Sequence, residues 1–162
     1  MMSDNINTSK ILLVDDERDI MNLLEKVLRQ EGFQNISKAT SGESAIEICR
    51  TKKPDAIILD IMLPGIDGIE VCKKIREFSI CPILFLSSKS DDVDKILGLS
   101  SGADDYVTKP FSPKEVAFRI KAQLRRKQFE QNNAGLKAII EAGGIQIDTD
   151  SQRVYKQTKR LA

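Results

Sequence analysis

The chain has 162 residues, of which 41% are apolar and 30% are charged, so it can form one complete globular domain and part of a second. The net charge of +1 argues neither for nor against nucleic-acid binding, and the absence of histidine excludes serine-type triads, most zinc sites and a phosphohistidine relay within the chain. No apolar run approaches the roughly 18 residues of a membrane span, so we expect a cytoplasmic protein with no membrane partner.

Short apolar runs alternate with amphipathic segments over the first three quarters of the chain. The pattern predicts strands at about 11–14, 35–38, 56–60, 82–86 and 105–107, and helices at about 20–32, 41–50, 68–78, 90–101 and 112–126. The expected buried helix positions include Ile20, Leu23, Leu24, Val27 and Leu28, and then Val71, Cys72, Ile75 and Phe78. Five strands alternating with five helices predict right-handed crossovers and an α/β fold with a doubly wound parallel sheet.

Several of these strands end in residues that carry chemistry: Asp15, Asp16, Asp60, Ser87 and Lys109. The carboxyl ends of parallel strands meet at one edge, where open α/β sheets bind ligands. Three converging carboxylates repel one another unless a cation joins them, and an all-oxygen site suits Mg²⁺ or Mn²⁺. An aspartate can accept a phosphoryl group, and a lysine and a hydroxyl can neutralise and bind its oxygens.

Each of these residues also has an ordinary structural interpretation. Asp15 and Asp16 could stabilise a helix N-terminus through its dipole, Ser87 could be a turn residue, and Lys109 could be a solvated surface lysine. Their joint occurrence at successive strand ends favours a site.

Four motifs in order resemble the receiver domain of bacterial two-component response regulators, over Lys10 to about Arg126. They are Leu13-Val14-Asp15-Asp16-Glu17, Leu59-Asp60-Ile61-Met62-Leu63-Pro64-Gly65, Leu86-Ser87-Ser88, and Gly102-Ala103-Asp104-Asp105-Tyr106-Val107-Thr108-Lys109-Pro110-Phe111. The resemblance implies the flavodoxin-like, CheY-like strand order 2-1-3-4-5. It also implies a sensor histidine kinase as the phosphoryl donor.

The resemblance assigns a role to each residue of the site. Asp60 would take the phosphoryl group, and Lys109 would pair with it. Mg²⁺ or Mn²⁺ would be bound directly by Asp16 and Asp60 and by the Met62 backbone carbonyl, with Asp15 assisting. Ser87 would be the switch hydroxyl and Tyr106 the switch aromatic. The Lys109-Pro110 bond resembles a cis peptide bond of the family.

The fourth motif, with Lys114, Glu115 and Arg119, resembles the OmpR/PhoB-like subfamily, whose receivers pair on phosphorylation. The resemblance implies a homodimer with ion pairs between Lys95 and Glu115 and between Asp105 and Arg119 across the interface. These pairs would surround an apolar patch that consists of Ile96, Leu99 and Ala117. The same charges could also form an ordinary solvated face, since exposed ion pairs contribute little singly.

The sequence predicts four segments. Residues 1–9 form a disordered N-terminus, residues 10–126 the receiver domain and residues 127–135 a linker. Residues 136–162 resemble part of the β-sheet that precedes a winged-helix effector, with β segments at 136–140, 144–147 and 153–155. The chain would then be a C-terminally truncated transcriptional regulator that binds DNA only through a missing effector domain.

Other functions are also compatible with parts of the pattern. The chain could be a stand-alone receiver or phosphotransfer module. A flavodoxin-like cofactor carrier would need a neutral phosphate loop where this chain has Asp15-Asp16-Glu17, and a haloacid-dehalogenase-like phosphatase would need a second aspartate where it has Met62. We therefore expect no enzyme, and only phosphorylation and dephosphorylation of the chain's own aspartate.

Overall fold

The structure, a computed structural model, describes residues 7–88 and 100–143. Its sheet has five strands: β1 (Lys10–Val14), β2 (Asn35–Ala39), β3 (Ala56–Asp60), β4 (Ile83–Ser87) and β5 (Asp105–Thr108). The order is β2-β1-β3-β4-β5, and every neighbouring pair is parallel. The predicted doubly wound sheet and its strand order are confirmed.

Four helices lie in the described part of the chain: α2 (Arg18–Gln30), α3 (Gly42–Lys52), α4 (Gly68–Arg76) and α6 (Pro113–Gly143). Helix α3 begins at Ser41, whose hydroxyl accepts a hydrogen bond from the Ser44 amide at 3.1 Å, and Asp67 caps α4 in the same way. The predicted helix at 90–101 lies almost entirely outside the described residues.

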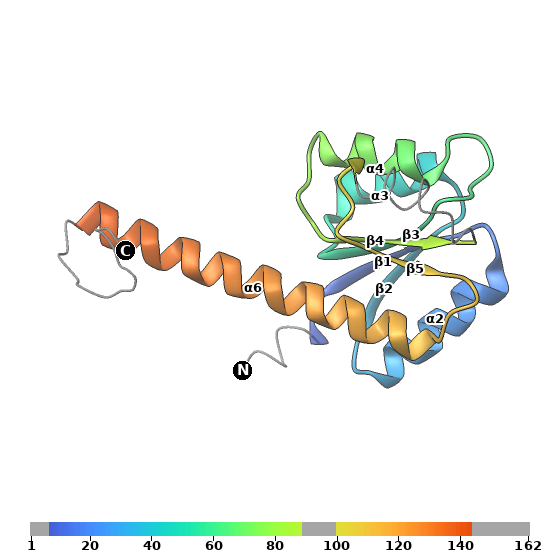
Figure 1. The fold of residues 1–162 in the computed structure, drawn as a ribbon, viewed down its shortest axis with the longest axis horizontal. Helices are drawn as coiled ribbons and strands as arrows, with labels where there is room; N and C mark the ends of the chain where they lie inside the picture. Colours follow the sequence, from blue (N-terminus) through green and yellow to red (C-terminus); the bar gives the residue numbers. More distant parts are fainter. Residues whose placement is uncertain (1–6, 89–99, 144–162) are drawn as a thin grey trace. The chain divides into compact units, whose positions relative to one another are not determined.

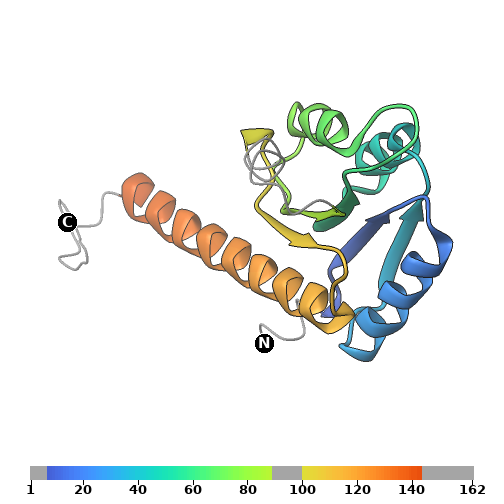
Figure 2. The same cartoon turned by 45° about the vertical axis from the view of Figure 1, so that its right-hand side comes forward.

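Helices cover both faces of the sheet (Figures 1 and 2): α3 and α4 one face, and α2 with the first part of α6 the other. The alternation of side chains along each strand produces these two layers. Ile11, Leu13 and Ile58 pack with α2 and α6, whereas Leu12, Val14 and Ile57 pack with α3 and α4. Because both faces are covered, the central strands β3 and β4 are apolar up to their last residues, Asp60 and Ser87.

Two predicted core positions are wrong. Leu23 is 49% exposed, because the buried stripe of α2 is centred on Met21, Leu24 and Leu28. Phe78 is 41% exposed, because α4 ends at Arg76 and the Phe78 ring instead lies beneath the Arg50 guanidinium, 4.9 Å from ring centroid to Cζ.

The predicted secondary structure after Arg126 also needs correction. Helix α6 continues through 127–135, where a linker was expected, and through 136–140, where a β segment was expected. These residues contain no proline and are rich in Lys, Gln, Glu, Ala and Leu, which favour helix, and the single Gly135 does not end it. The expected β segments at 144–147 and 153–155 lie outside the described residues.

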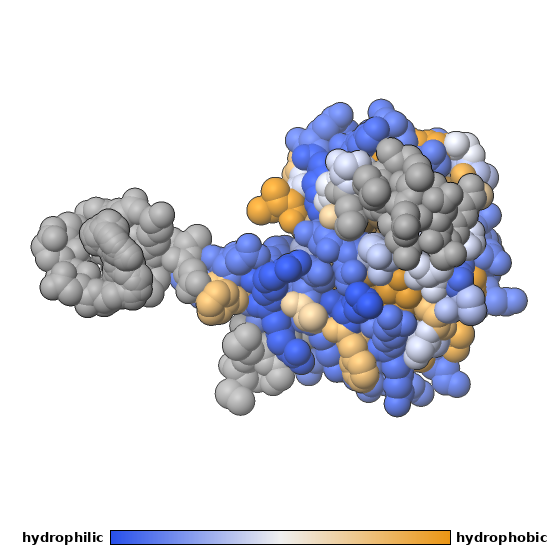
Figure 3. All heavy atoms as spheres, in the orientation of Figure 1, coloured by the Kyte–Doolittle hydropathy of each residue, from blue (hydrophilic) through white to orange (hydrophobic). Residues whose placement is uncertain are grey.

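Packing divides the chain into two compact units, Met1–Arg126 and Lys127–Ala162. The sheet, α2, α3, α4 and the part of α6 up to Arg126 belong to the first unit, whose described surface is mainly hydrophilic on the face seen in Figure 3. Within the described ranges, none of the helices combines the length and the apolar character that a membrane span needs.

Candidate functional site

The sheet brings the predicted site residues together at the carboxyl ends of its strands. Asp15 follows β1, Asp60 and Ser87 are the last residues of β3 and β4, and Lys109 follows β5. Backbone hydrogen bonds fix these ends relative to one another: the Lys109 amide donates to the Ser87 carbonyl oxygen at 2.6 Å, and the Ile61 amide to the Leu86 carbonyl oxygen at 3.0 Å. The side chains therefore converge on a rigid framework.

The three aspartates form one cluster. Oxygens of Asp15, Asp16 and Asp60 all lie within 4.8 Å of one another. Asp15 and Asp60 are 1% and 2% exposed, whereas Asp16 is exposed. One oxygen of each buried carboxylate is held by a tight turn: Asp15 Oδ1 accepts from the Glu17 amide at 2.9 Å, and Asp60 Oδ1 from the Met62 amide at 3.0 Å. The Oδ2 atoms remain available for a cation.

Lys109 supplies a cation to this cluster. Its Nζ lies 3.3 Å from Asp60 Oδ2, 3.4 Å from Glu17 Oε1 and 3.7 Å from Asp15 Oδ2. Burial by itself would lower the pKa of Lys109, but the charges of Asp60 and Asp15 outweigh it and the pKa is raised. Lys109 is therefore held in its charged form.

The cluster still carries more negative than positive charge. Burial, reinforced by the charge of Asp60, raises the pKa of Asp15 to about 6, despite the hydrogen bond from the Glu17 amide and the charge of Lys109. Asp15 Oδ2 is buried and accepts no hydrogen bond from any residue that the structure describes. A buried carboxylate oxygen without a partner is costly, and a further cation would relieve that cost. The hard oxygen donors therefore fit Mg²⁺ or Mn²⁺.

A glycine allows α4 to start directly against this cluster. A Cβ atom on Gly68 would overlap the Asp60 carbonyl oxygen and lie 2.7 Å from Ile61 Cα. The Gly68 amide instead donates to the Ile61 carbonyl oxygen at 2.9 Å. Only glycine permits this approach of backbone to backbone, so Gly68 fixes the turn that follows Asp60.

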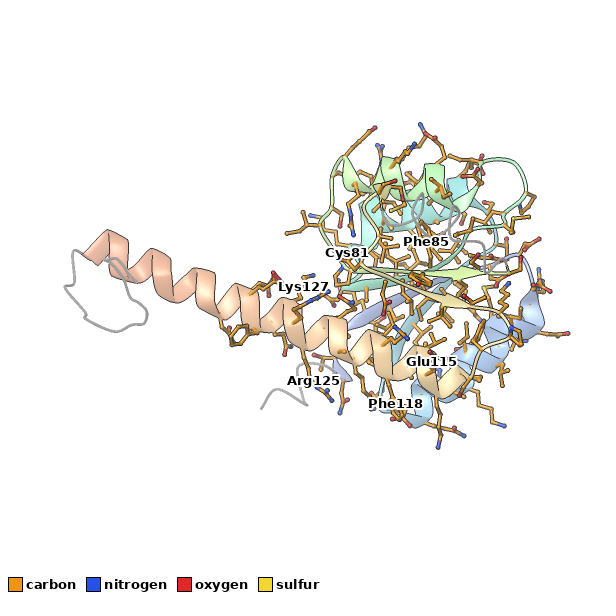
Figure 4. The ribbon with its side chains drawn as sticks, viewed as in Figure 1. Cys81, Phe85, Glu115, Phe118, Arg125 and Lys127 are labelled. Atoms are coloured by element: carbon orange, nitrogen blue, oxygen red, sulfur yellow. The ribbon has the colours of Figure 1, made fainter. Side chains whose placement is uncertain are left out.

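The two predicted switch residues lie on neighbouring strands. Ser87 is buried at the end of β4 and is in register with Thr108 on β5. Tyr106 is partly buried, is in register with Phe85, and packs against the apolar layer under α3 and α4. Phe85, the β4 partner of Tyr106, is labelled in Figure 4. The Met62 side chain is 53% exposed.

The predicted dimer residues are only partly tested by the described residues. Arg119 Nη1 pairs with Asp105 Oδ2 at 2.9 Å and Arg119 Nε with Glu115 Oε2 at 3.2 Å, both within one chain. Ala117 is fully buried, so its assignment to an exposed patch is wrong. It lies one position from Val116 and three from Ile120 on the buried side of α6. Lys95, Ile96 and Leu99 lie outside the described residues.

Glu17 has no predicted role beyond its place in the first motif. The structure places its carboxylate against Lys109 while its side chain stays 59% exposed. The only sign of this contact in the sequence is that a third acidic residue directly follows Asp15 and Asp16. Acidic residues are common in the first turn of a helix, so this sign alone is not specific.

Residues 11–121 match the response regulator receiver domain family. The chain is 46% identical over 158 residues to the alkaline phosphatase synthesis transcriptional regulatory protein PhoP of Bacillus subtilis, covering 94% of this chain and 65% of PhoP. It also resembles DrrB of Thermotoga maritima, described as an OmpR/PhoB homologue, with 34% identity, a TM-score of 0.68 and coverage of 74% of this chain and 54% of DrrB. The BeF3-activated DrrB receiver domain gives 34% identity, a TM-score of 0.67 and coverage of 73% and 98%.

The chain therefore belongs to the response regulator receiver domain family, and its receiver is of the kind found in two-component response regulators of the OmpR/PhoB type. It spans about two thirds of the length of PhoP. Receiver domains of this family bind Mg²⁺ at an acidic pocket, and the aspartate cluster matches that requirement.

Proposed function

We propose that Asp60 is the phosphoryl acceptor of this regulator and that a sensor histidine kinase is the donor. The observation that carries the proposal is the placement of a buried Asp60 carboxylate 3.3 Å from Lys109 Nζ, within a cluster of three aspartates at the ends of parallel strands. The chain has no histidine, so a phosphohistidine donor must be another molecule.

The transfer step follows from this placement. An Asp60 carboxylate oxygen forms a bond to phosphorus as the P–N bond of the donor's phosphohistidine breaks, and the electron pair of that bond returns to the imidazole ring. Lys109 and the Ser87 hydroxyl bind the oxygens of the transferred group. We assign Mg²⁺ to Asp15, Asp16, Asp60 and the Met62 carbonyl oxygen, where the ion would offset the negative charge of the aspartates and the phosphoryl group.

The new charge at Asp60 would act on Ser87 and Tyr106. A phosphoryl group adds roughly 1.5 to 2 negative charges and draws the Ser87 hydroxyl towards it. Ser87 and Tyr106 occupy the adjacent strands β4 and β5, so a shift of Ser87 changes the space available to the Tyr106 ring. This coupling would carry the signal from the site to the surface formed by β5 and α6.

That surface would be the contact between two phosphorylated chains. Asp105, Glu115 and Arg119 are charged groups at its edge, and we keep Lys95, Ile96 and Leu99 as proposed members. Because exposed ion pairs contribute only about 0–1 kcal/mol each, the unphosphorylated chain is expected to be a monomer. We also propose that the protein acts in the cytoplasm and, like the relatives named as transcriptional and DNA-binding regulators, controls transcription through a DNA-binding effector domain.

The acceptor assignment is tested by phosphorylation with acetyl phosphate and Mg²⁺, followed by intact-mass analysis. The chain should gain the mass of one phosphoryl group, and Asp60→Asn should gain none. Asp19→Asn is the matched control, because Asp19 is an exposed carboxylate in the first turn of α2, and it should be labelled like the unchanged chain. Full labelling of Asp60→Asn would disprove the assignment.

The same reaction separates this function from that of a phosphatase. A phosphatase would release phosphate steadily from a small phosphate ester, whereas a receiver stops after one phosphoryl group per chain, apart from slow hydrolysis of its own aspartyl phosphate. Met62 occupies the position where the phosphatase family needs a second aspartate. We therefore expect no sustained turnover.

A further inference from the structure

Lys109 has a third carboxylate partner that differs from the other two. Asp15 and Asp60 are buried, and each has one oxygen anchored by a backbone amide. The Glu17 carboxylate reaches Lys109 Nζ at 3.4 Å from an exposed position, with its side chain 59% accessible. It is not one of the three aspartates that lie within 4.8 Å of one another. Glu17 thus contacts the cation of the site without belonging to the aspartate cluster.

We propose that Glu17 is a positioning residue that holds the Lys109 ammonium back in the unphosphorylated chain and must release it when a phosphoryl group arrives. The inference rests on the phosphoryl-acceptor function proposed above. Its basis is a competition for one cation, since Lys109 Nζ has three carboxylates within 4 Å and a phosphoryl group on Asp60 would be a fourth anionic partner.

Exposure decides which partner is released. An ammonium group has three N–H donors, so it cannot donate a good hydrogen bond to each of four anions at once. Asp15 and Asp60 cannot move away, because their turns fix them and water does not reach them. Glu17 can move into water at little cost, since an exposed ion pair contributes only about 0–1 kcal/mol. Its backbone stays in place, because the Glu17 amide is the donor to Asp15 Oδ1.

The proposal predicts that removing the Glu17 charge favours the phosphorylated state. Glu17→Gln should bind beryllofluoride, a phosphoryl analogue, about two- to five-fold more tightly at saturating Mg²⁺. Asp19→Asn removes the same charge two residues further along, from an exposed position in α2 that has no contact with Lys109 among the described residues, and should leave the affinity unchanged. Equal tightening by both substitutions would show a general charge effect and overturn the proposal.

A second measurement reads the position of Lys109 directly. In a crystal structure of the beryllofluoride complex of the unchanged chain, the Glu17 carboxylate should lie beyond hydrogen-bonding distance of Lys109 Nζ, and Lys109 should contact a fluorine atom. A Glu17–Lys109 contact that persists in the complex overturns the proposal. So does an unchanged affinity in Glu17→Gln.

The two proposals fail in different ways. If the unchanged chain does not bind beryllofluoride with Mg²⁺, the phosphoryl-acceptor function fails. If the unchanged chain binds it and Asp60→Asn does not, that function stands and the comparison of Glu17→Gln with Asp19→Asn decides the role of Glu17 alone. Urea unfolding of both variants in the absence of Mg²⁺ should match the unchanged chain within about 1 kcal/mol, which separates positioning from an effect on folding.

Discussion

The buried carboxylate of Asp15 lowers the stability of the folded chain when no cation is bound to it. Its carboxylate is almost completely buried, its Oδ2 atom accepts no hydrogen bond from the described residues, and its pKa is raised to about 6 from 3.8. Burial is the largest cause, and the neighbouring charge of Asp60 adds to it. At neutral pH an ionised Asp15 therefore opposes folding.

Asp15→Asn should stabilise the chain when no divalent cation is present. The amide keeps an acceptor for the Glu17 amide and removes the buried charge. Since one pKa unit corresponds to 1.36 kcal/mol, we expect the free energy of unfolding at pH 7 to rise by about 1–3 kcal/mol in urea titrations. Mg²⁺ should stabilise Asp15→Asn less than the unchanged chain. A variant less stable than the unchanged chain without Mg²⁺ would contradict this account.

The stabilisation that Asp15→Asn produces should depend on pH in a defined direction. Between pH 3.8 and about 6 the folded chain keeps a proton on Asp15 that the unfolded chain releases, so the contribution of this group to stability falls as pH rises through that range. Below pH 3.8 Asp15 is neutral in both states. The difference in unfolding free energy between Asp15→Asn and the unchanged chain should therefore be largest above pH 6 and vanish near pH 3.8. A difference independent of pH would assign the effect to packing.

At the scale of elements, one arginine joins three segments on the side of the sheet away from the aspartates. Arg76, the last residue of α4, donates to the carbonyl oxygens of Gly102 at 2.8 Å and Cys81 at 2.6 Å, and pairs with Asp104 Oδ2 at 2.9 Å. Asp104 Oδ2 also accepts from the Ile83 amide. The guanidinium thus links α4 to the starts of β4 and β5.

Replacement of Arg76 should destabilise the end of the sheet where β4 and β5 start. Arg76→Met removes the guanidinium donor from four acceptors, which are the carbonyl oxygens of Ser79, Cys81 and Gly102 and the Asp104 carboxylate. We expect a loss of about 2–3 kcal/mol in unfolding free energy, with faster hydrogen exchange at the Ile83 and Asp104 amides. Arg76→Lys should not restore it, because an ammonium lacks the planar fork. Arg29→Met removes an exposed pair with Glu25 and an exposed hydrogen bond to the Gln34 carbonyl oxygen, and it should cost about 0–1 kcal/mol. Equal losses for Arg76→Met and Arg29→Met would contradict the role of Arg76.

The sequence predicted elements well where local pattern and tertiary packing agree. Continuous apolar runs predict β3 and β4, and their terminal polar residues predict which side chains converge, because a parallel sheet brings strand ends together. Leu23 was misplaced because helical periodicity fixes the direction of a buried stripe only to within about one residue. Ala117 was misplaced because a resemblance carries a residue over by its position in a motif and does not give its burial. Glu17 and Arg76 were missed because their partners, Lys109 and Asp104, are distant in sequence.

The continuation of α6 was missed for another reason. Apolar periodicity is lost after Arg126, and this loss predicts a linker, although helix propensity needs no apolar face. Asn132 lies on this continuation with an exposed side chain, so it tests the helix directly. Asn132→Ala should increase the helical signal in far-UV circular dichroism, and Asn132→Pro should decrease it, because proline breaks a helix interior. An unchanged signal in both variants would support the linker.

At the scale of the whole molecule, the charged residues Asp105, Glu115 and Arg119 on β5 and α6 can pair within one chain or across a dimer interface. In one chain, Arg119 is already paired with Asp105 and with Glu115, whose position on α6 is marked in Figure 4. A two-fold axis would let each group meet its opposite on a second copy at little cost, since exchanging exposed pairs changes the free energy only slightly. The pairs would then set the register of the dimer, and the change on phosphorylation would supply the driving force.

This arrangement predicts that association depends on both phosphorylation and Arg119. The chain should sediment as a monomer at low micromolar concentration and as a dimer when beryllofluoride and Mg²⁺ are added. Arg119→Glu places a third negative charge beside Asp105 and Glu115 and should keep the chain monomeric in both conditions, because like charges would face each other across the axis. Arg125→Glu makes the same charge change at an exposed position on the same helix and should still dimerise. A chain that stays monomeric with beryllofluoride, or a dimer that tolerates Arg119→Glu as well as Arg125→Glu, would exclude this surface.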